Sequence, residues 1–311
     1  MAITAAMVKE LRELTGAGMM DCKKALGETD GNMDEAVEYL RKNGQAKAEK
    51  KASRIAAEGL CTVVVKDDKT AAVVEVNSET DFVAKNETFQ QFVKAVAEQA
   101  VESDAADMDA FMEEKWNEDP SKTVKDALVE KVAVIGENLK IRRFEKVVAT
   151  NGCVVSYVHG GGRNGVIVEA ETAVVNDAVK EALTNLAMQI AALNPKYVSR
   201  DEISEEYIAH EKEILLAQIM NDPKESQKPE KVINGMIEGR VSKELKEICL
   251  VDQVYVKAED GKQTVAKYLE EVSKAVGTPV SVKRFVRFET GEGIEKKQED
   301  FAAEVAAQMN A

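Results

Sequence analysis

The sequence predicts an α+β protein in which two related subdomains each combine an antiparallel sheet with a helix. In the first half, two strand-like runs flank the short polar turn "DDK", namely "LCTVVVK" and "TAAVVEVN", and the amphipathic run "ETFQQFVKAVAEQA" follows them. The same order returns about 90 residues later in "GCVVSYVHGGGRNGVIVEAE" and "NDAVKEALTNLAMQIAAL". A closing strand-like run also occurs in each half, as "NLKIRRFEKV" and as "PVSVKRFVRFE". We therefore expect core subdomains at residues 59–148 and 149–290.

Residues 1–45 predict a small three-helix domain. Thr4 can cap a first helix that ends at Gly16, and Asn32 with Glu35 has the spacing of a capping box that opens a third helix. That third helix is expected to end near Asn43-Gly44. The apolar residues that recur at helical spacing are Val8, Leu11 and Leu14, then Met19, Cys22 and Leu26, then Met33, Val37 and Leu40. The tight "TGAG" turn should leave Met19 near the surface.

A basic stretch, residues 46–58, follows this domain and is rich in alanine and lysine. Its composition favours helix, but it has no wide apolar face, so we interpret it as a solvated helical linker. Contact with nucleic acid is the alternative for such a basic run. The absence of interleaved aromatic residues and the acidic balance of the whole chain argue against it.

The second half contains an insertion that the first half lacks. Two long helical runs are separated by the breaker "PKESQKP", which predicts an antiparallel helical hairpin at 195–250 projecting as an arm. The chain closes with a module at 291–311, whose final amphipathic helix would carry Phe301 and Val305. In the first half, a helix is expected near 122–135, whereas the acidic region 103–120 reads as variable surface.

Composition narrows the classes of function. The chain has 311 residues and a formal net charge of −14, so it should repel nucleic-acid phosphates, and we expect no direct nucleic-acid partner. No apolar run approaches the ~20 residues that span a bilayer, and no signal sequence is evident, so we expect no membrane contact and a cytoplasmic location. The four cysteines are scattered and there are only two histidines, so we expect neither a metal site nor a cofactor.

The search for catalytic chemistry finds no complete constellation. The run "HGGG" at 159–162 resembles an oxyanion loop, but a hydrolase would also need a G-x-S-x-G nucleophile elbow, which is absent. No phosphate-loop motif occurs either. A turn between two strands explains the glycines, with His159 exposed as a contact residue. A protein without a catalytic site but with an arm and terminal appendages is expected to bind a partner.

Five stretches together resemble the bacterial elongation factor Ts family, which exchanges the nucleotide of elongation factor Tu. They occur in the expected order along essentially the whole chain: "LRELTGAGMMDCKKAL" at 11–26, "EVNSETDFVAKN" at 75–86, "SYVHGGGRNGV" at 156–166, "MIEGR" at 236–240 and the tail "GEGIEKKQEDFAAEVAA". The resemblance implies an N-terminal domain like ubiquitin-associated domains, a two-part core, a helical arm of coiled-coil type and a C-terminal helical module.

The resemblance also implies a mechanism and its residues. Asp81 and Phe82 would enter elongation factor Tu near its Mg²⁺ site, with Phe82 separating partner side chains and Asp81 disturbing the polar network around the metal. GDP would leave because an exchange factor binds the nucleotide-free partner more tightly than the GDP-bound one. The protein would act on both states without making a covalent bond. Apart from the resemblance, the projecting arm leaves self-association open as a further role.

Docking contacts are carried over to other matching positions in the same way. Leu11, Met19 and Met20 would form an apolar patch for the nucleotide-binding domain, with Lys23 adding a polar contact. His159 would reach a different domain of the partner. The C-terminal residues Phe301 and Val305 would add contacts to the nucleotide-binding domain.

Two readings from other classes remain open at the level of sequence. One is an adaptor for peptides or ubiquitin-like proteins built on residues 1–45 alone. The other is a hydrolase that uses His159.

Overall fold

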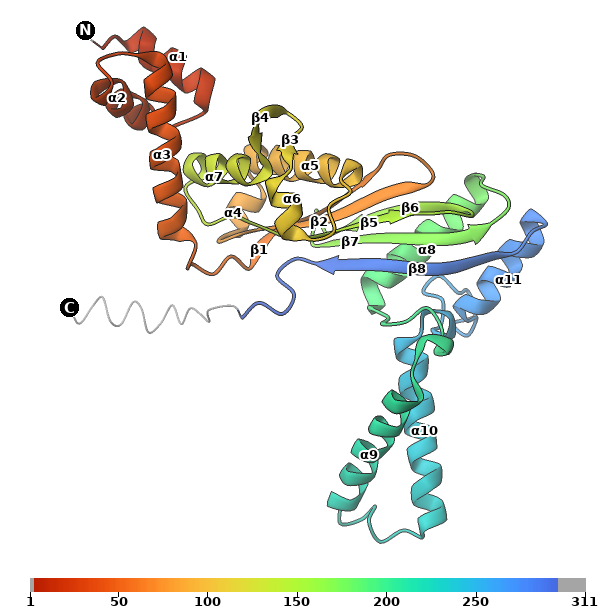
Figure 1. Ribbon diagram of the computed structural model, residues 1–311. Coiled ribbons are helices and arrows are strands. Elements are labelled where there is room, and N and C mark those ends of the chain that lie inside the picture. The colour runs from red at the N-terminus through yellow and green to blue at the C-terminus, as the bar shows by residue number, and fades with distance from the viewer. Residues whose placement is uncertain (1–2, 296–311) are drawn as a thin grey trace.

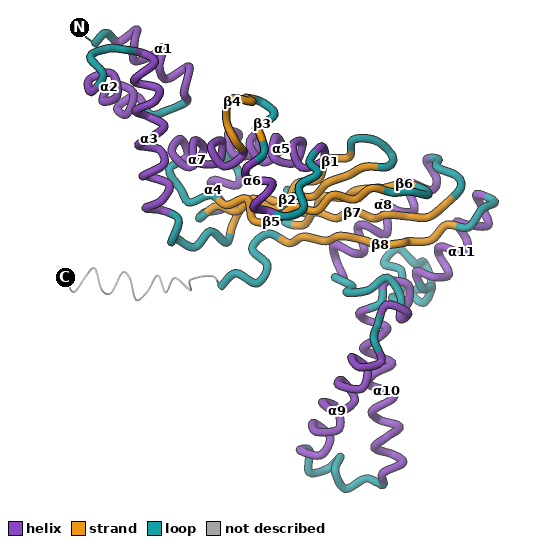
Figure 2. Tube along the Cα trace, in the orientation of Figure 1, coloured by secondary structure: helices purple, strands orange, loops and turns teal. Residues whose placement is uncertain are grey.

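A computed structural model describes residues 3–295 and shows an α+β protein with a small helical domain at one end and a long helical arm at the other (Figures 1 and 2). Two three-stranded antiparallel sheets form the centre, in the orders β1-β2-β5 and β6-β7-β8. Helices cover the outer face of each sheet, and the inner faces pack on each other. The predicted fold class is therefore confirmed.

The N-terminal domain consists of α1 (Ala5–Thr15), α2 (Met19–Glu28) and α3 (Met33–Lys51). The side chains of Thr4 and Asn32 accept hydrogen bonds from the backbone at the starts of α1 and α3, as their positions in the sequence predicted. Gly16 ends α1 in the left-handed conformation, with φ at 67°. The buried residues of its core are Val8, Leu11, Cys22, Ala25, Leu26 and Ala36.

The predicted end of the third helix at Asn43-Gly44 is wrong, because α3 continues to Lys51. Gly44 is buried, and a side chain there would begin 3.4 Å from Cβ of Ala133 in α7 (Val124–Ile135). The glycine thus permits close helix packing instead of terminating the helix. The strong helix formers after it carry α3 onward, so the helix spans part of the expected linker.

The first half of the core contains β1 (Glu58–Val65), β2 (Thr70–Ser78) and β5 (Lys140–Val148), with α4 (Asp81–Ala84) and α5 (Glu87–Glu102) inserted after β2. Helices α5 and α7 cover its outer face. The remaining elements are α6 (Met108–Glu113), β3 (Lys115–Trp116) and β4 (Asp119–Thr123).

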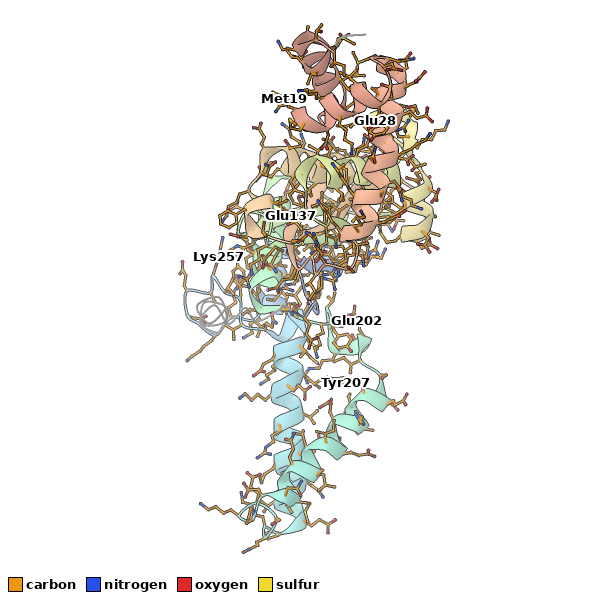
Figure 3. The ribbon with its side chains drawn as sticks, turned by 90° about the vertical axis from the view of Figure 1, so that its left-hand side faces the viewer. Met19, Glu28, Glu137, Glu202, Tyr207 and Lys257 are labelled. Atoms are coloured by element: carbon orange, nitrogen blue, oxygen red, sulfur yellow. The ribbon has the colours of Figure 1, made fainter. Side chains whose placement is uncertain are left out.

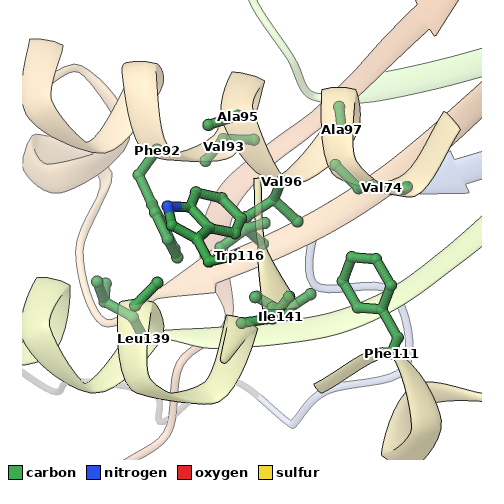
Figure 4. Close-up of a cluster of buried hydrophobic side chains, with 14 of the residues drawn as sticks. Val74, Phe92, Val93, Ala95, Val96, Ala97, Phe111, Trp116, Leu139 and Ile141 are labelled. Atoms are coloured by element: carbon green, nitrogen blue, oxygen red, sulfur yellow. The ribbon is translucent and has the colours of Figure 1, made fainter. Parts of the chain in front are cut away.

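The acidic region 103–120 matches none of the five family stretches and was therefore interpreted as variable surface, but it also contributes to the core. Phe111 is fully buried and Trp116 almost so, and the Trp116 ring lies 5.9 Å from that of Phe92 (Figure 4). Both join the core between α5 and the sheet. The acidic residues of this segment surround two large apolar anchors, so it contributes to the stability of the first half.

The second half repeats this plan with β6 (Cys153–His159), β7 (Asn164–Thr172) and β8 (Val280–Glu289). Helices α8 (Asp177–Leu193) and α11 (Val265–Val276) cover its outer face. The arm lies between them in the chain: α9 (Glu205–Asn221) and α10 (Glu230–Ile248) pack as an antiparallel hairpin that projects away from the sheets (Figure 1). Short 3₁₀ turns, Arg200–Glu202 and Leu250–Asp252, flank its base.

Two buried carboxylates show how closely the halves correspond. Glu75 in β2 and Glu169 in β7 lie in the middle strands, each beside a register shift at which the neighbouring strand, β5 or β8, has one extra residue. Glu75 pairs with Arg142 and Arg143 of β5, and Glu169 pairs with Lys283 and Arg284 of β8. The same carboxylate, bulge and consecutive basic pair recur, so the two subdomains are structurally related.

The end of β8 returns to the first half. The backbone N–H of Gly291 donates to Oε1 of Glu75 at 2.8 Å. Gly291 has φ at 73°, and any side chain there would collide with the carbonyl oxygen of Ala57, the residue just before β1. Residues 57 and 291 therefore lie in contact at the edge of the core.

Candidate partner-binding surface

The segment from Ser78 to Asn86 joins β2 to α5 and presents Phe82 to solvent. Phe82 is 79% exposed, whereas its neighbour Val83 packs against the core of the first half. Successive residues in a helical turn point about 100° apart, so Val83 anchors α4 while Phe82 points outward. The Phe82 ring is therefore both exposed and held on an anchored turn, so it is available for contact with a partner.

Glu137, in the loop between α7 and β5, fixes the start of this segment. Its Oε2 accepts hydrogen bonds from the backbone N–H groups of Glu79 and Thr80, at 3.1 and 3.0 Å. Its Oε1 accepts from the Thr80 hydroxyl at 2.7 Å. At the other end, the side chain of Asn86 accepts from the backbone of Thr88 and Phe89 and so caps α5. Both ends of the Phe82 turn are thus held by hydrogen bonds.

Asp81 is partly exposed and forms an ion pair with Lys85. Nζ of Lys85 lies 2.7 Å from Oδ2 of Asp81 and 6.0 Å from the centre of the Phe82 ring. The hydrogen bond and the charge of Lys85 lower the pKa of Asp81, so its carboxylate stays ionised at neutral pH. The exposed tip therefore combines one negative group, one positive group and one aromatic ring.

His159 lies at the end of β6, before three consecutive glycines that all have positive φ. The turn packs on β1: the N–H of Cys61 donates to the carbonyl oxygen of Gly162 at 2.7 Å. A side chain at Gly162 would begin 2.6 Å from Cδ2 of Leu60, so the Leu60 side chain would have to shift to admit one. Because α4 also contacts β1, both predicted contact segments are built on the same strand.

The N-terminal domain presents methionines beside its tight first turn. Met19, labelled in Figure 3, is 59% exposed, and Met20 is 75% exposed; Lys23 is also exposed. Leu11, by contrast, is fully buried in the three-helix core, so its assignment to a docking surface is wrong. Leu14 was expected in the core but is 67% exposed, because it lies in the last turn of α1, beyond the core residues.

The sequence analysis did not identify Glu137 and Tyr157 as parts of this surface, and two other predicted contact residues lie outside the described range. No local sequence pattern indicates that Glu137 holds a loop distant in the chain. Tyr157 contacts His159, and the two-residue strand spacing could have indicated their shared face. Phe301 and Val305 lie outside the described residues.

Residues 3–295 contain no group of three His, Cys, Asp or Glu side chains arranged to hold a metal ion. All four cysteines are free and buried, and burial raises the pKa of Cys61 to about 12. None of the described helices is both long enough and apolar enough to cross a membrane.

Comparison with known proteins gives a consistent result along the chain. The family model described as "Elongation factor TS" matches residues 79–292. The chain is 52% identical to the elongation factor Ts of Clostridium novyi (strain NT) over 309 residues, covering 99% of both chains. It is 54% identical to that of Clostridioides difficile (strain 630) and 51% identical to that of Clostridium tetani (strain Massachusetts / E88), each over 308 residues and 99% of both chains. This chain therefore belongs to the elongation factor Ts family.

Proposed function

We propose that this protein is a guanine-nucleotide exchange factor that acts on elongation factor Tu in the cytoplasm during translation elongation. Family membership supports an exchange role in elongation. The observation that carries the mechanism is the exposure of Phe82 on a turn fixed at both ends. In this proposal Phe82 enters the partner near its Mg²⁺ site and separates side chains there, and Asp81 competes for the polar groups that hold the metal and its waters.

The Asp81–Lys85 pair suits that role. The pair is exposed and is worth little to the stability of the free protein, so the carboxylate can exchange Lys85 for a partner group at small cost. Phe82 loses contact with water when it enters the partner, which favours association through burial of apolar surface. Because the GDP-bound partner has its metal site intact, these contacts favour the nucleotide-free state, and GDP is released.

In this proposal, residues outside the Phe82 turn also contact elongation factor Tu. Met19 and Met20 offer flexible apolar side chains beside a tight turn, with Lys23 close in sequence. His159 supplies a second contact from the other half of the core, and Phe301 and Val305 supply a third. Contacts from several parts of the chain would position the Phe82 turn without requiring a catalytic group or a bound cofactor.

The test is release of fluorescently labelled GDP from elongation factor Tu, with and without this protein. Acceleration at micromolar concentrations of the exchange factor is expected, and co-purification with nucleotide-free elongation factor Tu should be reversed by excess GDP. Equal release rates with and without this protein would refute the proposal. A fragment of residues 1–45 that retained all binding would favour the adaptor reading instead.

We infer separately that the arm mediates self-association. Leu216 and Met220, one helical turn apart on α9, are exposed, as is Val232 on α10. Sedimentation equilibrium should detect a dimer that the paired substitutions Leu216→Glu and Met220→Glu abolish. A wild-type protein that stays monomeric over a 100-fold range of protein concentration would contradict this inference.

A further inference from the structure

Tyr157 and His159 form a hydrogen-bonded pair on one face of β6. They are two residues apart, so both side chains leave the strand on the same side. The hydroxyl oxygen of Tyr157 lies 2.9 Å from Nδ1 of His159, and the ring centres are 5.8 Å apart. Within residues 3–295, neither side chain makes another hydrogen bond.

The two members of the pair are anchored very differently. The ring of Tyr157 is partly buried against the core between the second sheet and its helices. His159 is exposed and is followed by three glycines, so the chain after it provides no side chain to hold the imidazole. The orientation of the His159 ring therefore depends on Tyr157.

The direction of this hydrogen bond sets which ring nitrogen carries the proton, because Nδ1 can accept from the tyrosine O–H or donate to the tyrosine oxygen. A neutral imidazole has one nitrogen that donates and one that accepts. When the tyrosine O–H donates to Nδ1, the proton of the ring must be on Nε2. The exposed nitrogen is then a donor, and it lacks a hydrogen-bond partner within residues 3–295.

We propose that Tyr157 is a positioning residue for the partner contact of His159, holding the ring so that Nε2–H is offered to an acceptor atom of elongation factor Tu. This inference rests on the proposed function, which places His159 against the partner. The partner group must be a hydrogen-bond acceptor, such as a carbonyl, carboxylate or hydroxyl oxygen, because Nε2–H is a donor. The reverse tautomer would instead require a donor on the partner.

The first experiment examines the free protein by NMR of the imidazole nitrogens, at a pH where the rings are neutral. The chain has two histidines, so a His210→Gln background leaves His159 as the single imidazole in the spectrum. The proton should be on Nε2, with Nδ1 showing the shift of an acceptor. Tyr157→Phe should return both nitrogens toward a mixture of tautomers. An unchanged spectrum in Tyr157→Phe, or a proton on Nδ1 in the parent, would overturn the proposal.

The second experiment is a double-mutant cycle in binding to nucleotide-free elongation factor Tu. Tyr157→Phe keeps the buried ring and should weaken binding roughly two- to tenfold, the range for loss of one neutral hydrogen bond. In a His159→Ala background the same change should have no effect. Tyr207→Phe is the matched control: it removes a hydroxyl that donates to Glu244 in the arm, at 3.0 Å, and should leave binding unchanged.

The outcomes separate this inference from the proposed function. An equal loss from Tyr157→Phe in both backgrounds, or normal binding by His159→Ala, would overturn the positioning role while exchange activity remained. If the wild-type protein did not accelerate GDP release, the proposed function would fail, and the positioning role in that complex would fail with it. The tautomer measurement needs no partner and would still report whether Tyr157 controls the ring.

Discussion

Replacing Phe82 by alanine should impair nucleotide exchange while leaving the free protein as stable as before. Full burial of a phenylalanine side chain contributes about 1.5–3 kcal/mol. Because 79% of Phe82 is exposed in the free chain, roughly four fifths of that energy remains to be gained on binding, or about 1.2–2.4 kcal/mol. Its loss corresponds to a roughly 7- to 60-fold weaker affinity for nucleotide-free elongation factor Tu.

The neighbouring Phe89 provides a matched control. It is fully buried on α5, seven positions along the chain from Phe82, and its replacement by alanine should lower the free energy of unfolding by about 3–5 kcal/mol. Phe82→Ala, as a surface change, should alter that free energy by less than about 0.5 kcal/mol.

Two measurements decide the matter. Stopped-flow release of fluorescent GDP gives the exchange efficiency, and urea unfolding gives the stability of both variants. The reasoning fails if Phe82→Ala unfolds as easily as Phe89→Ala, or if it exchanges nucleotide as fast as the wild type. Phe82→Leu, which keeps part of the apolar surface, should fall between the wild type and Phe82→Ala in exchange.

Three further predictions follow from contacts in the core. Glu137→Ala leaves two backbone N–H groups without their acceptor, which should lower the free energy of unfolding by about 1–3 kcal/mol per unpaired group. Amide hydrogen exchange at Glu79 and Thr80 should become faster, and GDP release should become slower. Unchanged protection of these amides would contradict the clamp. Gly162→Ala should destabilise the protein more than Gly161→Ala in urea, because only the former places Cβ against Leu60, whereas both have positive φ; equal midpoints would argue against this close approach. Burial of Glu75 opposes its ionisation, but hydrogen bonds from Gly291, Asn77 and Arg142 and the charge of Arg143 lower its pKa overall. Ionised Glu75 therefore stabilises the folded protein at pH values above its unfolded pKa, near 4.5. This stabilisation is lost as the pH falls through the lower pKa of the folded state. Glu75→Gln should remove this component of acid destabilisation, and an identical pH profile in the variant would refute that assignment.

Periodicity in the sequence was sufficient to place the two sheets, the helices α5, α7 and α8 and the arm, but α11 was not predicted. It could not decide between neighbouring apolar residues. Leu11 and Leu14 have the same helical spacing, yet only Leu11 reaches the centre of the three-helix core. Phe82 and Val83 are likewise adjacent, and the direction of each depends on how a single helical turn is anchored.

Long-range contacts explain the other differences. Gly44 read as a helix end, but its role is set by Ala133, which lies far along the chain. Phe111 and Trp116 were hidden within an acidic region, because average composition says little about two isolated anchors. The clamp made by Glu137 joins two segments that are 57 positions apart in the chain, so neither segment indicates it alone.

The contact between Gly291 and Ala57 gives the protein a common attachment point for its two terminal parts. The N-terminal domain enters the core at residue 57, and the residues after β8 leave it at residue 291. In the proposed complex, a first contact of either part with elongation factor Tu would make the second contact intramolecular and so raise its effective concentration. Individually weak contacts would then give a tight but reversible complex, because each could dissociate while the other stayed bound.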